Sequence, residues 1–210
     1  MSTMWIIRLS CVFLLFAMVI ANSYFLRNRQ KHQGLMENTA ANLLVVIVYN
    51  ALHYIAVALP SGKSFFDLAP SLNQPFATVW YSAAGILLAA SGVAILIATV
   101  RSRRSLGSQT PANEIHTGGT YALCRHPIYA GIVLISLGIA VALKNLDGLM
   151  VLPLLIGADV LEATFEERLD MVPRFGSAYG EYRKSKRPFG PAWSWIAIAV
   201  MLSVPLATAI

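Results

Sequence analysis

The chain has 210 residues, of which 57% are apolar and only 12% are charged. Water-soluble domains carry about 25% charged residues, so this composition excludes an ordinary soluble globule and a disordered chain. Two cysteines are too few for a disulfide-bonded secreted scaffold. The formal net charge of +6 does not indicate a nucleic-acid partner, because the basic residues lie in connectors between apolar segments.

Six apolar segments follow one another along the chain: 4–26, 43–59, 76–100, 128–143, 148–165 and 192–210. A helix needs about 20 apolar residues to cross the hydrocarbon core of a bilayer, which is roughly 30 Å thick. Segment 128–143 is shorter, and the polar residues Lys144, Asn145, Asp147 and Gly148 supply a tight turn into the next segment. The sequence therefore predicts an all-α integral membrane protein with about six transmembrane helices, including a short helical hairpin.

The distribution of basic residues predicts the orientation in the membrane. Of the sixteen Lys and Arg residues, all but Arg8, Lys63 and Lys144 lie in the first, third and fifth connectors. Cytoplasmic connectors collect Lys and Arg, so we expect these three connectors in the cytoplasm and both termini on the opposite side. We expect 4–26 to be a retained helix and not a cleaved signal peptide, because basic residues follow it and no A-x-A site does.

A basic connector passes into the fourth apolar segment through a cluster of residues: Gly119, Tyr121, Arg125, His126, Pro127, Tyr129 and Gly131. Proline suits the first turn of a helix, so we expect a helix to begin at Pro127 and its free backbone N–H groups to attract a carboxylate or phosphate. Arg125 and His126 flank that position, and Gly131 lets a ligand or a neighbouring helix approach closely. The alternative interpretation is an interfacial arginine, a capping histidine and a packing glycine.

Three acidic residues, Asp159, Glu162 and Glu166, are spaced i, i+3 and i+7, which places them on one helical face. Ionisable groups at membrane depth are costly and face a protein interior, where they find partners. We expect the partners to be Arg125 and His126 or a positively charged ligand. The alternative is an internal salt bridge that stabilises the hairpin.

Two further groups of polar residues stand out. Tyr179 and Tyr182 share a helical face and precede the basic run 183–187, a pattern that by itself is typical of a juxtamembrane segment on anionic lipid. Asn50 and His53, three residues apart in the second apolar segment, are predicted to form interhelical hydrogen bonds.

Taken in order, these motifs resemble the isoprenylcysteine carboxyl methyltransferase family, which is related to the membrane phospholipid methyltransferases. The resemblance covers roughly residues 104–191, under half of the chain. It rests on Gly119-Thr-Tyr121, Arg125-His126-Pro127-Ile-Tyr129-Ala-Gly131, Glu166-Glu167, and Phe175-Gly176 with Tyr179 and Tyr182.

The resemblance implies that S-adenosylmethionine is the methyl donor, bound in a C-terminal pocket that faces the cytoplasm. It divides a single membrane domain, 1–210, into N-terminal spans 1–100, a cofactor-binding region 101–191 and a last span 192–210. It implies that Arg187 orients the acceptor and that Glu166 or Glu167 takes the ammonium group of the donor. The implied cofactor-binding residues are Tyr121, Arg125, His126, Pro127, Tyr129, Gly131, Glu167, Tyr179 and Tyr182.

The charges of the donor have counterparts in the sequence. Tyrosine faces suit the sulfonium, Glu166 and Glu167 suit the ammonium, and a helix N-terminus with Arg125 suits the carboxylate. The expected acceptor is the carboxylate of a prenylated cysteine, which needs no general base because its pKa is about 3.5. A phospholipid amine needs a base, and Glu162 or Glu166 is suited to that role. The lipid tail is expected to enter from the bilayer.

Several alternatives stay open. The acceptor is either a prenylated cysteine, a phospholipid amine or a small thiol. A second functional hypothesis is an NADPH-dependent membrane reductase, although the chain has no glycine-rich dinucleotide fingerprint. A third is a non-catalytic lipid-binding subunit. We expect no metal and no nucleic acid as partners, and a location in the inner membrane of a prokaryote or the endoplasmic reticulum of a eukaryote.

Overall fold

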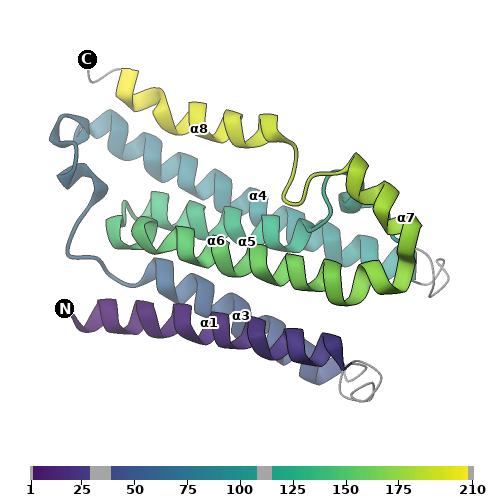
Figure 1. Cartoon of the computed structure of the whole chain (residues 1–210). Helices are drawn as coiled ribbons and strands as arrows, with labels where there is room; N and C mark the ends of the chain where they lie inside the picture. Colours follow the sequence, from purple (N-terminus) through teal and green to yellow (C-terminus); the bar gives the residue numbers. More distant parts are fainter. Residues whose placement is uncertain (1, 29–38, 108–114, 208–210) are drawn as a thin grey trace.

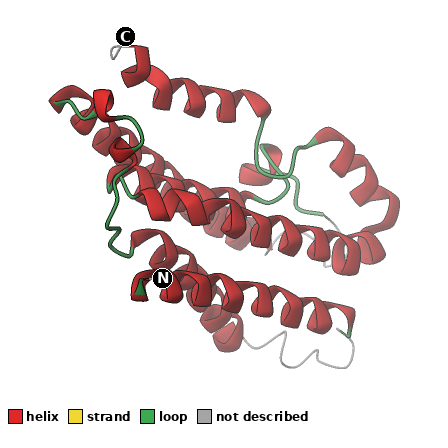
Figure 2. Cartoon of the chain, turned by 60° about the vertical axis from the view of Figure 1, so that its left-hand side comes forward, coloured by secondary structure: helices red, strands yellow, loops and turns green. Residues whose placement is uncertain are grey.

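The structure is a computed structural model that describes residues 2–28, 39–107 and 115–207. In these residues it is a bundle of helices joined by short loops, with no strand (Figures 1 and 2). The helices are α1 Thr3–Arg27, α3 Thr39–Ala58, α4 Pro75–Gly107, α5 Pro127–Ala142, α6 Leu146–Glu166, α7 Val172–Ser185 and α8 Ala192–Ala207. Short 3₁₀ helices lie at Phe65–Asp67, Pro70–Leu72 and Gly119–Ala122, and a π-helical turn lies at Glu167–Met171.

Six of these helices correspond to the six predicted apolar segments. Three helical stretches are long and apolar enough to cross a membrane, and the shorter α3, α5 and α8 are also apolar. The all-α membrane architecture is therefore confirmed. The beginning of α1 and the end of α8 lie at one end of the bundle, and α7 lies at the other, as expected for helices that alternate in direction (Figure 1).

The hydrophobic core lies where α1, α3, α5 and α6 meet. Leu15, Val57, Ile132 and Leu155, one from each of these helices, are at most 1% exposed. Outward-facing positions on the same helices are apolar as well, because lipid and not water surrounds a membrane helix. This reverses the pattern of a soluble bundle, whose outer face is polar.

Helices α4 and α5 pack closely because glycines face each other along their contact. A side-chain Cβ at Gly85 would lie 2.4 Å from the backbone N of Ala142, and one at Gly138 would lie 2.5 Å from the backbone N of Ala89. At Gly131 the same position is occupied by Leu96 and the carbonyl of Gly92, both of α4. Of the two interpretations of Gly131, the geometry supports the approach of a neighbouring helix.

The predicted hairpin between α5 and α6 is present. Lys144 takes a left-handed conformation (φ 52°), and the Asn145 side chain caps α6 by accepting a hydrogen bond from the backbone N of Gly148 at 2.9 Å. Arg8 of α1 is fully buried beside this turn, where it donates to the carbonyl of Ala56 at 3.1 Å and lies 3.6 Å from Asp147 Oδ2. These contacts tie α1, α3 and the hairpin together at the end of the bundle opposite α7.

Candidate functional site

The chain reverses direction after α6 through two unusual backbone features. A π-helical turn, Glu167–Met171, continues α6, and Gly176 interrupts α7 with φ 53° and ψ −126°. That conformation is accessible almost only to glycine, because it lacks a Cβ. Consequently α7 folds back across the end of the bundle and does not extend away from it (Figure 1).

This reversal brings the segment after α7 against the loop before α5. The backbone N of Arg125 donates to the carbonyl of Arg187 at 3.0 Å, and that of His126 donates to Pro188 at 2.9 Å. The Tyr182 hydroxyl donates to the carbonyl of Tyr121 at 2.8 Å. Tyr179 and Tyr182, which were predicted to share a helical face, are both buried. Tyr182 thus ties α7 to the loop.

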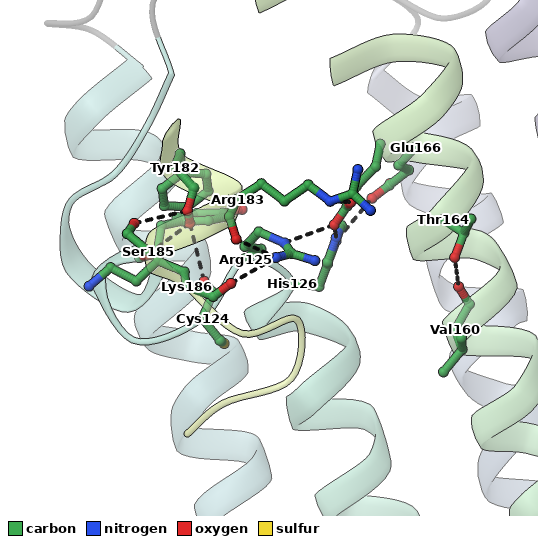
Figure 3. A network of polar contacts seen from close by, with 12 residues as sticks. Cys124, Arg125, His126, Val160, Thr164, Glu166, Tyr182, Arg183, Ser185 and Lys186 are labelled. Carbon is green, nitrogen blue, oxygen red and sulfur yellow. Dashed lines mark hydrogen bonds and ion pairs between the residues drawn. The ribbon is translucent and has the colours of Figure 1, made fainter. Parts of the chain in front are cut away.

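Glu167 is the centre of a charged network, and its partners Arg125, His126 and Arg183 are labelled in Figure 3. Its Oε1 accepts from Arg125 Nε at 2.9 Å and lies 2.8 Å from His126 Nε2, while its Oε2 lies 3.3 Å from Arg183 Nε. Arg125 Nη1 also donates to the carbonyls of Arg183 and Lys186, at 2.9 and 2.7 Å. The Glu167 side chain is only 7% exposed, so its charge is neutralised inside the protein.

Glu166 has fewer partners and greater access to solvent. Its Oε1 accepts a hydrogen bond from the Tyr129 hydroxyl at 3.1 Å, and its Oε2 lies 3.6 Å from His126 Nδ1. Its side chain is 33% exposed. The two adjacent glutamates therefore differ: Glu167 holds protein cations, and Glu166 keeps a carboxylate accessible to a ligand.

The environment of His126 favours the charged imidazolium. Burial acts to lower the pKa of His126, but the carboxylates of Glu166 and Glu167 more than offset this and raise the pKa above its ordinary value. Burial also raises the pKa of the neighbouring Cys124 thiol to about 11, although a hydrogen bond with the backbone of His126 opposes the rise. Cys124 is therefore a neutral thiol near pH 7 and a poor nucleophile.

A cavity of about 740 Å³ adjoins the network, and five of its lining side chains are cationic. It is lined by Arg125, Gly180, Arg183, Lys184, Ser185, Lys186, Arg187 and Pro188. A concave surface of one charge sign attracts ligands of the opposite sign, so this cavity suits a carboxylate or phosphate. Arg187, predicted to orient the acceptor, lies in its wall.

At one end of the bundle the structure brings together the Arg125-His126-Pro127 turn, the Glu166-Glu167 pair and the tyrosines of α7. Helix α5 begins at Pro127 as expected. The predicted pairing of Asp159 with Arg125 or His126 was wrong. Asp159 Oδ1 does not meet Arg125 or His126; it accepts from the Tyr49 hydroxyl at 2.9 Å and lies 3.3 Å from His53 Nε2. The helical face of Asp159 turns toward α3.

His53 lies 3.3 Å from Asp159 of another helix, but its ring nitrogens form no hydrogen bond with a described residue, so the predicted hydrogen bond is absent there. The interhelical hydrogen bond predicted for Asn50 was also wrong. Asn50 bonds within its own helix, to the carbonyl of Val46 and the hydroxyl of Tyr54. Sequence reasoning also missed Tyr49 and Asn22, which bond Asp159 and Glu162. The i, i+4 spacing of Tyr49 and His53 was an available signal for Tyr49.

The fold and this site define a helical membrane protein with a charge-paired site at the end of the bundle where α7 folds back. The chain is 31% identical to the protein-S-isoprenylcysteine O-methyltransferases of Rattus norvegicus and Mus musculus, and 29% identical to that of Homo sapiens. Each match covers 66% of this chain and 51% of the relative, so the chain spans about half the length of the curated relatives it matches. The predicted resemblance to the isoprenylcysteine carboxyl methyltransferase family is confirmed. No family model and no solved structure matches the chain.

Proposed function

We propose that this protein is an S-adenosylmethionine-dependent methyltransferase whose acceptor is the carboxylate of a prenylated cysteine. The observation that carries the proposal is the accessible Glu166 carboxylate at the edge of a buried charge network and beside a cationic cavity. The names of the relatives support the same chemistry, since they describe O-methyl transfer to isoprenylcysteine.

The side chains of the candidate site complement the charged groups of S-adenosylmethionine. Glu166 is the carboxylate left accessible, so it is the proposed ligand of the ammonium group, and Tyr129 holds it in place through a 3.1 Å hydrogen bond. The cations of the cavity complement a carboxylate. The rings of Tyr129 and Phe189 lie 5.8 and 6.2 Å from that of His126 and offer aromatic faces of the kind that attract a sulfonium.

The protein contributes to this reaction mainly by aligning the methyl donor with the acceptor. When bound, S-adenosylmethionine supplies an electrophilic methyl group. The acceptor carboxylate is already ionised near pH 7, so no side chain has to remove a proton. Arg187 is proposed to orient this carboxylate, and Glu167 fixes the loop that carries Arg125 and His126. Holding two reactants in line and away from water accounts for a large part of the rate of such a displacement.

The reaction can be measured with purified protein and a donor that carries a labelled methyl group. We expect label in N-acetyl-farnesylcysteine, and none in its preformed methyl ester, because the ester has no free carboxylate. Phosphatidylethanolamine and a small thiol belong in the same panel. Label in either of these alone would contradict the proposed acceptor, and label in none of the compounds would remove the proposed activity.

Calorimetry tests the donor site separately. We expect the protein to bind S-adenosylmethionine and not NADPH, and Glu166→Gln to weaken that binding at least tenfold, about 1.4 kcal/mol. Glu181→Gln is the matched control, because Glu181 lies on α7 with a side chain that is 75% exposed and paired only with Lys184. Equal affinity in the Glu166 variant and the control would show that Glu166 is not the ammonium ligand. Binding of NADPH alone would indicate a reductase.

A further inference from the structure

A second group of polar side chains lies deeper in the bundle, between α1, α3 and α6. Asp159 Oδ1 accepts from the Tyr49 hydroxyl at 2.9 Å and lies 3.3 Å from His53 Nε2. Glu162 accepts a hydrogen bond from Asn22 of α1. We call these five residues, Asn22, Tyr49, His53, Asp159 and Glu162, the inner polar cluster.

The inner polar cluster continues inward from the candidate active site. Glu162 lies one helical turn before Glu166, about 6 Å along α6, and Asp159 lies almost one turn further. Tyr49 interacts electrostatically with all three of these carboxylates. The cluster is nevertheless a separate set of groups, since its side chains contact neither Glu167 nor the lining of the cationic cavity in any described interaction.

The cluster has polar atoms without hydrogen-bond partners. Asp159 Oδ2 and Glu162 Oε2 are buried and accept no hydrogen bond from any described residue, and neither ring nitrogen of His53 forms one there. The Asp159 and His53 side chains are 0% and 1% exposed, and Glu162 is 6% exposed. Leaving a buried acceptor unpaired is costly, and leaving a carboxylate unpaired costs more. These atoms therefore point to a missing donor.

The missing donor is cationic. Among the described residues, His53 is the one basic side chain with a contact to these two carboxylates, and Arg125 and Arg183 pair with Glu167 instead. A primary ammonium carries one positive charge and three N–H donors. These donors match the unpaired carboxylate oxygens Asp159 Oδ2 and Glu162 Oε2. A metal ion fits less well, since the described residues contain no group of three or more His, Cys, Asp or Glu arranged to hold one.

We propose that the inner polar cluster binds the primary ammonium group of a membrane amphiphile. The surrounding surface supports a lipid-borne ligand, because α1 and α3 present exposed apolar side chains such as Phe13, Ile20 and Ile47 to the bilayer. An amphiphile places its charged group near membrane depth while its tail stays among the lipids. The inner polar cluster uses other side chains than the methyl-donor site proposed above, although Tyr49 interacts electrostatically with Glu166.

Binding of dodecylamine to the full chain in a non-ionic detergent tests this inference by calorimetry. We expect saturable binding to the wild type, and at least tenfold weaker binding to the double variant Asp159→Asn/Glu162→Gln. Dodecyltrimethylammonium, which has the charge but no N–H donor, and dodecanol, which has no charge, should each bind the wild type at least tenfold more weakly than dodecylamine. Equal binding by the double variant, equal binding of the quaternary ammonium, or no binding of dodecylamine overturns the proposal.

Two controls separate this result from others. Glu181→Gln removes an exposed carboxylate and should leave dodecylamine affinity unchanged. The double variant should keep its affinity for S-adenosylmethionine within about threefold, so failure of the ammonium site and failure of the donor site give different results. If the double variant does not fold, the preference of the wild type for the primary over the quaternary ammonium decides the question.

Discussion

Glu166 and Glu167 are adjacent in the chain but have different surroundings. Glu167 is held by Arg125, His126 and Arg183, whereas Glu166 is bonded by Tyr129 and remains partly open to solvent. The difference arises because consecutive residues on a helix point about 100° apart, so one faces the loop before α5 and the other faces the bundle end. The two positions should therefore respond differently to the same isosteric change.

We expect Glu167→Gln to destabilise the protein. The change leaves Arg125 and His126, whose side chains are 10% and 6% exposed, without their main counter-ion. Removing one partner of a buried pair costs about 3 kcal/mol or more, which corresponds to a decrease in Tm of roughly 6–12 °C. Thermal unfolding in detergent measures this. Glu181→Gln should shift Tm by less than about 2 °C, since exposed pairs contribute little. Equal shifts in both variants would refute the buried network.

The raised pKa of His126 predicts a pH dependence of stability. Folding favours protonated His126, so its contribution is fully present below the unfolded pKa of about 6.5 and is lost as pH rises through the raised folded pKa. Between about pH 6.5 and about pH 9, Tm of the wild type should therefore decrease more than Tm of His126→Asn. Parallel pH profiles for the two proteins would show that His126 is not held as an imidazolium.

At the scale of elements, the contact between α4 and α5 depends on the absence of side chains. Alanine has a higher helix propensity than glycine, by about 1 kcal/mol, so a substitution without a clash stabilises. At Gly85 and Gly138 the added Cβ meets backbone atoms at 2.4 and 2.5 Å, and backbone cannot move aside as a flexible side chain can. The helices would have to separate.

We therefore expect Gly85→Ala and Gly138→Ala to lower Tm by several degrees, because overpacking costs about 1–3 kcal/mol. Gly157→Ala on α6 is the matched control, since its nearest neighbour, Phe16, lies 4.0 Å from the new Cβ. That variant should unfold at the wild-type temperature or slightly above it. A decrease in Tm for Gly157→Ala as large as for Gly85→Ala would indicate a general effect of alanine and not close packing.

At the scale of the whole molecule, the helices alternate so that α7 and the candidate site lie at the end of the bundle opposite the α5–α6 hairpin (Figure 1). The basic connectors predict that the α7 end faces the cytoplasm. In a background with Cys11→Ala and Cys124→Ala, we expect a membrane-impermeant maleimide to label Gly62→Cys in intact cells. Ser177→Cys on α7 should react only after permeabilisation. The reverse pattern would place the site on the outer face.

The sequence by itself determined the features that depend on neighbouring residues. Hydropathy identified the six apolar helices, Pro127 marked the start of α5, and Lys144 with Asn145 predicted the hairpin turn. The i, i+3 spacing also placed Tyr179 and Tyr182 on one buried face. Each of these follows from the covalent neighbourhood of a residue, since helix length, turn conformation and helical periodicity act within a few positions along the chain.

Only the tertiary structure decided which charges meet. Glu167 pairs with Arg125 and His126 from α5 and its preceding loop, while Asp159 pairs with Tyr49 and His53 of α3 and not with the cations expected for it. The sequence alone does not distinguish which cation pairs with each of these two carboxylates. The partner of each carboxylate depends on the direction in which its side chain points once the π-helical turn and the helix contacts have formed. Ion pairing depends on distances in space, and hydropathy and local spacing do not specify these distances.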